Sequence, residues 1–133
     1  MAVNALAEIV LWTSDLDAAL GFYRDLFGLE QISPADFPSK FLSTGLGPGG
    51  VPMMIVLVPH PAGGEAGFPR EKPRRVLHHL AFSVARERYD DLEARCREAG
   101  LEVRGGKHPV LADVRTFYVD DPDGNEVEVI APS

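Results

Sequence analysis

The side chains that could carry out chemistry occupy matching positions in two similar halves of this sequence. Glu8 in the first half corresponds to His79 in the second, and Ile55 corresponds to Glu128. Imidazole and carboxylate groups suit a first-row divalent metal ion, and a carboxylate can also move a proton. A lone histidine in a strand is nevertheless more often a structural residue than a ligand. Whether these side chains meet therefore depends on the elements that carry them.

Each half begins with a strand that is followed by a helix. Residues 8–12 and 79–84 are apolar-rich runs of strand length. The segment after each run has apolar residues at helical spacing, which predicts an amphipathic helix. Gly28 and Gly100 stand at matching places after these helices, where glycine can adopt the left-handed conformation that ends a helix.

Further strands follow each helix. Residues 55–59 and 128–132 match at the ends of the two halves, and both runs stop at a proline. Apolar runs at 41–44 and 114–119 predict one more strand before each of them. The glycine-rich residues 45–50 have no helix pattern after them, so we expect a hairpin loop there rather than a phosphate-binding loop.

The composition is that of one soluble globular domain. The chain has 133 residues, 45% of them hydrophobic, and no apolar stretch of the length that crosses a membrane. Its formal charge of −7 argues against nucleic acid as a partner, because phosphate binding needs a basic surface. The N-terminal residues do not have the pattern of a signal peptide, and the single Cys96 cannot form an internal disulfide. We therefore expect a cytoplasmic protein without membrane segments.

Two motifs give the sequence a family resemblance. Residues 13–19 lead into the run FYRDLFGL at 22–29, and residues 121–128 read DPDGNEVE. With these motifs at this spacing, nearly the whole chain resembles the vicinal oxygen chelate superfamily, which includes glyoxalases, fosfomycin-resistance thiol transferases, ring-cleaving dioxygenases and bleomycin-resistance proteins.

The resemblance implies an α+β fold in which two βαβββ modules form an open, cup-shaped sheet around a cavity. A single domain would then span residues 1–133, with the modules at about 5–59 and 75–132 and a linker at about 60–74. Pairing the modules hides a sheet face that each would expose alone, and it creates a concave site for a ligand.

The resemblance also implies a divalent metal ion, held from the first and last strands of each module. The matching positions are Glu8, Ile55, His79 and Glu128, so Glu8, His79 and Glu128 are the expected ligands. This oxygen-rich set suits Mn, Fe or Mg better than a closed zinc site, although Ni and Zn stay open. Glu8 is also the expected catalytic residue, as a carboxylate that moves a proton. In the alternative, the site is metal-free and Glu8 faces solvent at a strand end.

Alternation along the strands assigns the neighbouring side chains to faces. We expect His78 to point away from His79, and Glu126 to share a face with Glu128 and to be able to replace it as an acid.

Two groups of residues are candidate substrate contacts. Met53, Ile55 and Leu57 share one strand face and are expected to form an apolar wall. Arg115 and Tyr118 lie on the strand before the DPDG turn, where one of them would meet an anionic or phenolic group. Alternation places them on opposite faces, so only one can point into the cavity.

Two functions are consistent with these residues. The first is a metal-dependent lyase, isomerase, thiol transferase or dioxygenase that acts on a small molecule with neighbouring oxygens. The second is a metal-free protein of the bleomycin-resistance kind, which binds and sequesters a drug or natural product without chemistry. Members of the superfamily often pair, so a homodimer is expected. One scaffold hosts all of these activities, and the substrate does not follow from the fold.

Overall fold

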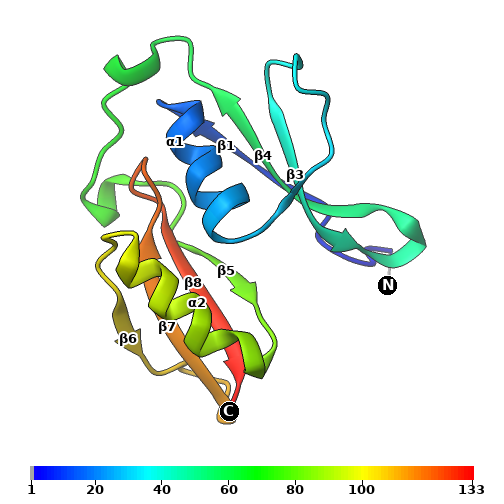
Figure 1. Cartoon of the computed structure of the whole chain (residues 1–133), viewed down its shortest axis with the longest axis vertical. Helices are drawn as coiled ribbons and strands as arrows, with labels where there is room; N and C mark the ends of the chain where they lie inside the picture. Colours follow the sequence, from blue (N-terminus) through cyan, green and yellow to red (C-terminus); the bar gives the residue numbers. More distant parts are fainter. Residues whose placement is uncertain (1) are drawn as a thin grey trace. The chain divides into compact units, whose positions relative to one another are not determined.

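The computed structural model describes residues 2–133, which fold into two compact units (Figure 1). One unit extends to Gly67 and the other runs from Phe68 to Ser133. Both follow the order strand, helix, then three strands, and this confirms the predicted pair of βαβββ modules. No helix within residues 2–133 is both long enough and apolar enough to span a membrane.

The first unit contains a four-stranded mixed sheet in the order β1-β4-β3-β2. A helix packs on it that continues from α-helical into wider π-helical turns. The elements are β1 (Glu8–Thr13), α1 (Leu16–Leu20) with its π-helical continuation (Gly21–Leu26), β2 (Glu30–Gln31), β3 (Lys40–Leu46) and β4 (Pro52–Pro59).

The second unit repeats this arrangement in the strand order β5-β8-β7-β6. Its elements are β5 (Leu80–Ser83), α2 (Arg86–Glu98), β6 (Arg104–Gly106), β7 (Val114–Asp120) and β8 (Glu126–Pro132). Helix α2 lies along one face of this sheet in Figure 1. Short 3₁₀ turns fill the connections at Pro48–Gly50, Gly63–Glu65 and Lys72–Arg74.

The helices begin and end for identifiable reasons. The Asp15 side chain caps α1 by accepting a hydrogen bond from the backbone N–H of Ala18 at 3.1 Å. Gly28 and Gly100 follow the two helices with φ of 79° and 82°, the left-handed conformation predicted for both. The predicted hairpin loop is also confirmed, because β3 and β4 pair as antiparallel neighbours on either side of residues 47–51.

Each sheet has one face for the helix and another that carries polar or exposed groups. In the second unit, Val127, Val129 and Ala131 alternate along β8 and are buried against α2. Glu126 and Glu128 point to the other face of the same strand. The helix therefore covers the apolar face, and the opposite face is free to hold a site.

The segment before β5 is fixed to the turn between β7 and β8. Arg75 donates to the backbone oxygens of Pro69 and Asp123 and to the side-chain oxygen of Asn125, at 2.6 Å for the last contact. Arg70 donates to the backbone oxygen of Pro122 at 3.1 Å. These contacts bring the cationic side chains of residues 70–75 beside the start of β8.

Candidate metal centre in the second unit

His79 and Glu128 meet on the face of the sheet that α2 leaves open. Strands β5 and β8 are parallel, and Ala81 pairs with Glu128. His79 lies directly before β5, and its side chain reaches the face that carries Glu128. The imidazole Nε2 is 3.2 Å from the carboxylate Oε1. The predicted ligands of the second module are therefore together.

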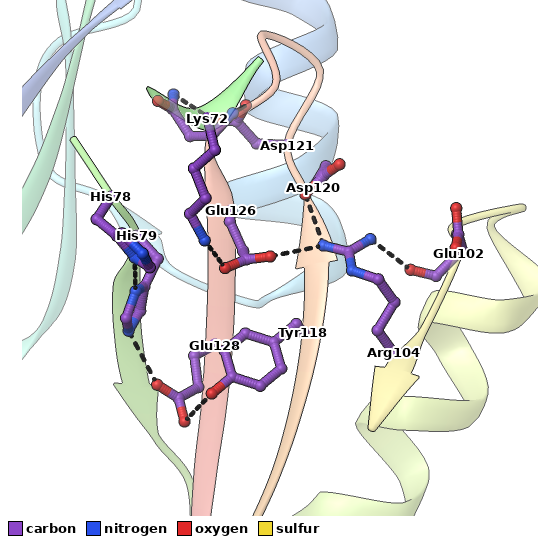
Figure 2. A network of polar contacts seen from close by, with 11 residues as sticks. Lys72, His78, His79, Glu102, Arg104, Tyr118, Asp120, Asp121, Glu126 and Glu128 are labelled. Atoms are coloured by element: carbon purple, nitrogen blue, oxygen red, sulfur yellow. Dashed lines mark hydrogen bonds and ion pairs between the residues drawn. The ribbon is translucent and has the colours of Figure 1, made fainter. Parts of the chain in front are cut away.

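The Glu128 carboxylate is almost completely buried and is oriented by two hydroxyl groups. Its exposed fraction is 2%. Thr116 donates to Oε2 at 2.6 Å. Tyr118 donates to the same oxygen at 3.0 Å (Figure 2). Both donors lie on β7, next to β8. Since they occupy Oε2, the other oxygen is the one directed at His79.

This arrangement passes a simple test of fit for a metal ion. Two ligand atoms, each about 2.1 Å from an ion and 90° apart, are separated by about 3 Å. The 3.2 Å between His79 Nε2 and Glu128 Oε1 is close to that separation. A buried carboxylate that receives only neutral hydroxyl donors retains a charge that a cation can balance. Metal ligands are typically held by such outer hydrogen bonds.

His78 departs from the expected position. Its Nδ1 lies 2.7 Å from the Nδ1 of His79, so the two rings are neighbours and the prediction that they point to opposite faces is wrong. Strand β5 begins only at Leu80, and alternation does not extend to the two residues before it. When His79 is the donor in this contact, its Nε2 presents a lone pair beside Glu128, as metal binding requires.

Glu126 shares the face of Glu128, as predicted, but it is held by cations. It forms ion pairs with Lys72 and, at 3.2 Å, with Arg104, which also pairs with Asp120 at 2.7 Å. Burial raises the pKa of Glu126, whereas its hydrogen bonds and charge interactions with Lys72 and Arg104 lower it more, and the net pKa is lowered. Glu126 is therefore held ionised and is a poor replacement acid.

A second set of possible ligands includes Glu126. Ligand atoms of His78, His79 and Glu126 lie within 4.8 Å of one another. The two cations on Glu126 already compensate its charge, and they would repel a metal ion placed there. Within residues 2–133 the Glu128 carboxylate contacts two hydroxyl groups and His79 and no lysine or arginine, so the pair His79 and Glu128 is the better metal centre.

Tyr118, rather than Arg115, faces the candidate metal centre. Tyr118 pairs with Glu128 across the β7–β8 ladder, and its ring packs edge-on to His79 at 6.0 Å. Burial, followed by its hydrogen bond to Glu128, raises the pKa of Tyr118. Arg115 points to the helix side, where it lies over the Tyr89 ring at 4.2 Å and pairs with Asp90 at 2.9 Å. The predicted alternation is confirmed, and Arg115 is occupied in contacts with α2.

Glu8 lies in the first unit, on strand β1. It is exposed, and it pairs in register with Met54 on β4. Val10 and Trp12 occupy the same face of β1, and each is 53% exposed. Glu8 is therefore available on an open sheet face, but it belongs to a different compact unit from His79 and Glu128.

The register of β4 changes the assignment of the fourth position. Ile55 pairs with Ile9, whereas Val56 pairs with Val10, on the face of Glu8. In the second unit, Glu128 pairs with Ala81, two residues after His79. The equivalent position in the first unit is Val10, two residues after Glu8. The structural counterpart of Glu128 is thus Val56 rather than Ile55. Matching the two halves by their terminal prolines shifted the alignment by one residue.

The expected apolar wall is part of the core of the first unit. Met53, Ile55 and Leu57 do share a face, as predicted. Ile55 and Leu57 are 5% and 1% exposed, and Leu42, which pairs with Ile55, is fully buried on that face. Ile55 and Leu57 therefore pack inside the unit, whereas Met53 is 36% exposed near the start of β4. None of the three lies on the face that carries Glu8.

Sequence reasoning missed several residues around the candidate metal centre. The cationic group comes from the segment before β5, which has no periodicity, and from β6, which has only three residues. Thr116 could have been found, because alternation places it with Tyr118 on β7. The residues missed are Lys72, Arg104, Thr116 and Asp120, and His78 was assigned to the wrong face.

Comparisons with known proteins agree with this fold. Residues 5–129 match the family described as the Glyoxalase/Bleomycin resistance protein/Dioxygenase superfamily. Among curated proteins, the chain is 30% identical over 121 residues to an ethylmalonyl-CoA/methylmalonyl-CoA epimerase from Cereibacter sphaeroides, covering 82% of this chain and 81% of the relative. It is 27% identical over 128 residues to the metallothiol transferase FosB from Shouchella clausii, covering 96% and 80%.

Solved structures share the same fold. A glyoxalase/dioxygenase from Nostoc punctiforme has a TM-score of 0.75 at 21% identity, covering 99% of this chain and 93% of that one. A variant of the fosfomycin resistance protein FosX from Listeria monocytogenes, complexed with Mn(II) and 1S,2S-dihydroxypropylphosphonic acid, has a TM-score of 0.69 at 24% identity, covering 98% and 92%.

Proposed function

Because the chain belongs to the glyoxalase/bleomycin resistance protein/dioxygenase superfamily, we propose that it is a divalent-metal-dependent enzyme that acts on a small molecule with neighbouring oxygens. One observation carries the proposal. His79 Nε2 and Glu128 Oε1 lie 3.2 Å apart, while the other Glu128 oxygen is held by Thr116 and Tyr118. An arrangement that serves only to fill space in a core would not need a buried carboxylate with this orientation.

His79 and Glu128 would hold the metal ion, with Glu8 of the partner subunit as the third ligand in the homodimer proposed below. Three protein ligands leave positions open, where a bound ion acts as a Lewis acid on the substrate oxygens. We place Mn, Fe and Mg ahead of Ni and Zn, because two carboxylates and one imidazole make an oxygen-rich set. The Mn(II) in the FosX complex supports this order.

Two side chains, Tyr118 and Glu8, would have further roles in the reaction. Tyr118 keeps its proton, since its pKa is raised, and its O–H holds Glu128 Oε2 in place beside His79. Glu8 is the candidate proton carrier. We favour isomerisation or thiol transfer over ring cleavage, because the relatives include an epimerase and a thiol transferase, and because Glu8 replaces the second histidine of the usual iron triad.

Metal content tests the proposal directly. Wild-type protein purified without chelator, then stripped and reloaded with single metals, is expected to bind one ion per chain with preference for one metal. His79→Ala and Glu128→Gln should each abolish this binding. His108→Ala is the matched control, because it removes an imidazole from a loop outside the candidate metal centre. Absence of stoichiometric metal under every loading condition would refute the enzyme proposal.

A sequestering protein is the second candidate, and the first unit favours it. Val10 and Trp12 leave large apolar surfaces exposed beside Glu8, and Val56 brings no ligand to the fourth position. Such a face suits an apolar or aromatic natural product. Binding of bleomycin that is unchanged in metal-free protein and lost in Trp12→Ala would support this candidate over the enzyme.

We also propose that the protein is a cytoplasmic homodimer. The open face of β1 supports pairing, because half-exposed apolar side chains on a sheet are commonly covered by a partner. Light scattering coupled to size-exclusion chromatography should give twice the mass of 14.5 kDa, and a monomer at every concentration would contradict it.

A further inference from the structure

A cationic pocket adjoins the candidate metal centre within the second unit. It has a volume of about 170 Å³ and lies at the start of β8, beside the turn that joins β7 to β8. This volume is below the roughly 300–1,000 Å³ of pockets that hold whole drug-sized ligands, so it suits one small group. Four cationic side chains line it: Arg70, Lys72, Arg75 and Arg104.

The carboxylates of the pocket compensate only part of this charge. Asp120 and Glu126 are the two acidic residues in the wall. Arg104 pairs with both of them, and Lys72 pairs with Glu126. When His78 is neutral, the lining keeps an excess of two positive charges, in a chain whose formal charge is −7. The local sign is opposite to that of the protein.

The excess charge belongs to the two arginines that precede β5. Arg75 contacts carbonyl oxygens and Asn125, whose amide in turn donates to the buried Asp121 at 2.8 Å. Its charge is thus partly balanced through that amide. Arg70 contacts only the backbone oxygen of Pro122, at 3.1 Å, and forms no ion pair within residues 2–133. Arg70 therefore has guanidinium donors to offer to a ligand.

The turn brings the two guanidinium groups together. A Cβ built on Gly124 would lie 2.7 Å from Nη1 of Arg70 and 3.1 Å from Nη1 of Arg75. Two like charges that converge on one point repel each other unless an anion lies between them or water screens them. Paired arginine forks are also the geometry that binds phosphate and carboxylate oxygens most strongly.

From these observations we propose that the pocket binds an oxyanion group of the substrate, of the phosphate, phosphonate or carboxylate class. That the group belongs to the substrate rests on the proposed function, whereas anion binding itself does not. His78 lines the pocket and contacts His79, which connects the pocket to the candidate metal centre. Glu126 and Glu128 are two residues apart on β8, which is about 7 Å along a strand. The substrate would thus carry its anionic group a few bonds away from its metal-binding oxygens.

Titration with simple anions tests the proposal on EDTA-treated protein, where no metal can bind the anion. Inorganic phosphate and acetate are added separately while backbone and histidine signals are followed by NMR. We expect saturable binding of phosphate at millimolar concentrations, shifts centred on residues 70–78 and 124–126, and weaker binding of acetate. Tighter binding of acetate than of phosphate would assign the pocket to a carboxylate group instead of a phosphoryl group.

Charge-matched variants separate the pocket from general attraction. Arg70→Gln should weaken phosphate binding about tenfold, the expected loss of one charge-assisted contact. Arg97→Gln removes the same charge from α2, on the other side of the sheet, and should leave binding unchanged. Equal effects of the two variants, or no saturable binding to folded wild-type protein, would overturn the proposal. Metal binding by Arg70→Gln should stay intact, so failure here is distinguishable from failure of the proposed function.

Discussion

Thr116→Val is the most informative single change at the candidate metal centre. The Thr116 hydroxyl donates to Glu128 Oε2 at 2.6 Å, and the two residues are 5% and 2% exposed. Valine has nearly the shape of threonine, so the change removes one hydrogen bond to a buried carboxylate and alters little else. It should lower both the free energy of unfolding and the affinity for metal.

The magnitude follows from what remains around Glu128. Hydrogen bonds to charged groups contribute about 1.5–3 kcal/mol. Tyr118 still donates to the same oxygen at 3.0 Å, so we expect the lower part of this range, about 1.5–2 kcal/mol. For a chain of this size that corresponds to a fall in Tm of roughly 5–10 °C. Loss of such an orienting partner typically weakens metal binding by about 10–100-fold.

Two measurements on the same samples check these values. Chemical denaturation of metal-free protein gives the free energy of unfolding, and competition with a fluorescent chelator gives the metal affinity. Thr44→Val is the matched control, since its exposed hydroxyl donates at 3.3 Å to the backbone oxygen of Met53 in the other unit. It should change the stability by less than about 0.5 kcal/mol and leave the metal affinity unchanged.

The two measurements refute different steps of the reasoning. If Thr116→Val destabilises the chain but retains full metal affinity, the hydroxyl supports the fold and does not orient a ligand. If neither quantity changes, the short hydrogen bond contributes nothing. Tyr118→Phe extends the test, because two donors to one oxygen should give non-additive effects in the double variant.

Three further changes have definite expected outcomes. Burial raises the pKa of the Cys96 thiol to about 11 and leaves its side chain without exposed surface. At pH 8 it should therefore react with DTNB far more slowly in native than in unfolded protein, and equal rates would contradict this expectation. Gly124 has a φ of 84°, so Gly124→Ala should lower the free energy of unfolding by about 1–2 kcal/mol in chemical denaturation. Gly64→Ala, whose added Cβ would meet no neighbour, should be neutral. A neutral Gly124→Ala would show that alanine is tolerated at this φ. If Glu8 serves the site of a partner chain, as we expect, refolded mixtures of Glu8→Ala and His79→Ala should bind metal that neither variant binds alone.

The two βαβββ units could be predicted because duplication repeats a signal. The matched strands, helices and helix-ending glycines each occur twice, and Gly28 and Gly100 have the predicted conformation. The short strands β2 and β6 were not found by periodicity, since two or three residues cannot show an alternating pattern. These strands exist through their hydrogen-bonded partners on β3 and β7.

Register is the level at which sequence reasoning failed. Pro59 lies opposite Thr13 at the end of the β1–β4 ladder, whereas Pro132 extends beyond the partners of β5 and pairs with Val114. The two prolines therefore lie at different positions of their ladders. Aligning them placed Ile55, instead of Val56, at the position equivalent to Glu128. Shifting a strand by one residue moves every side chain to the other face, and a small alignment error therefore turned a core residue into an expected substrate contact.

The two glutamates of β8 illustrate why a site needs its surroundings to be known. Glu126 and Glu128 have the same side chain and the same face, and alternation alone makes them equivalent. Lys72 and Arg104 neutralise Glu126, whereas Thr116, Tyr118 and His79 orient Glu128 without a permanent cation. At the Glu128 end of this face, negative charge is left to bind a cation. At the Glu126 end, the positive charge of Arg70 is left to bind an anion. A ligand that carries an anionic group beside metal-binding oxygens would satisfy both ends, and it could bind in only one direction.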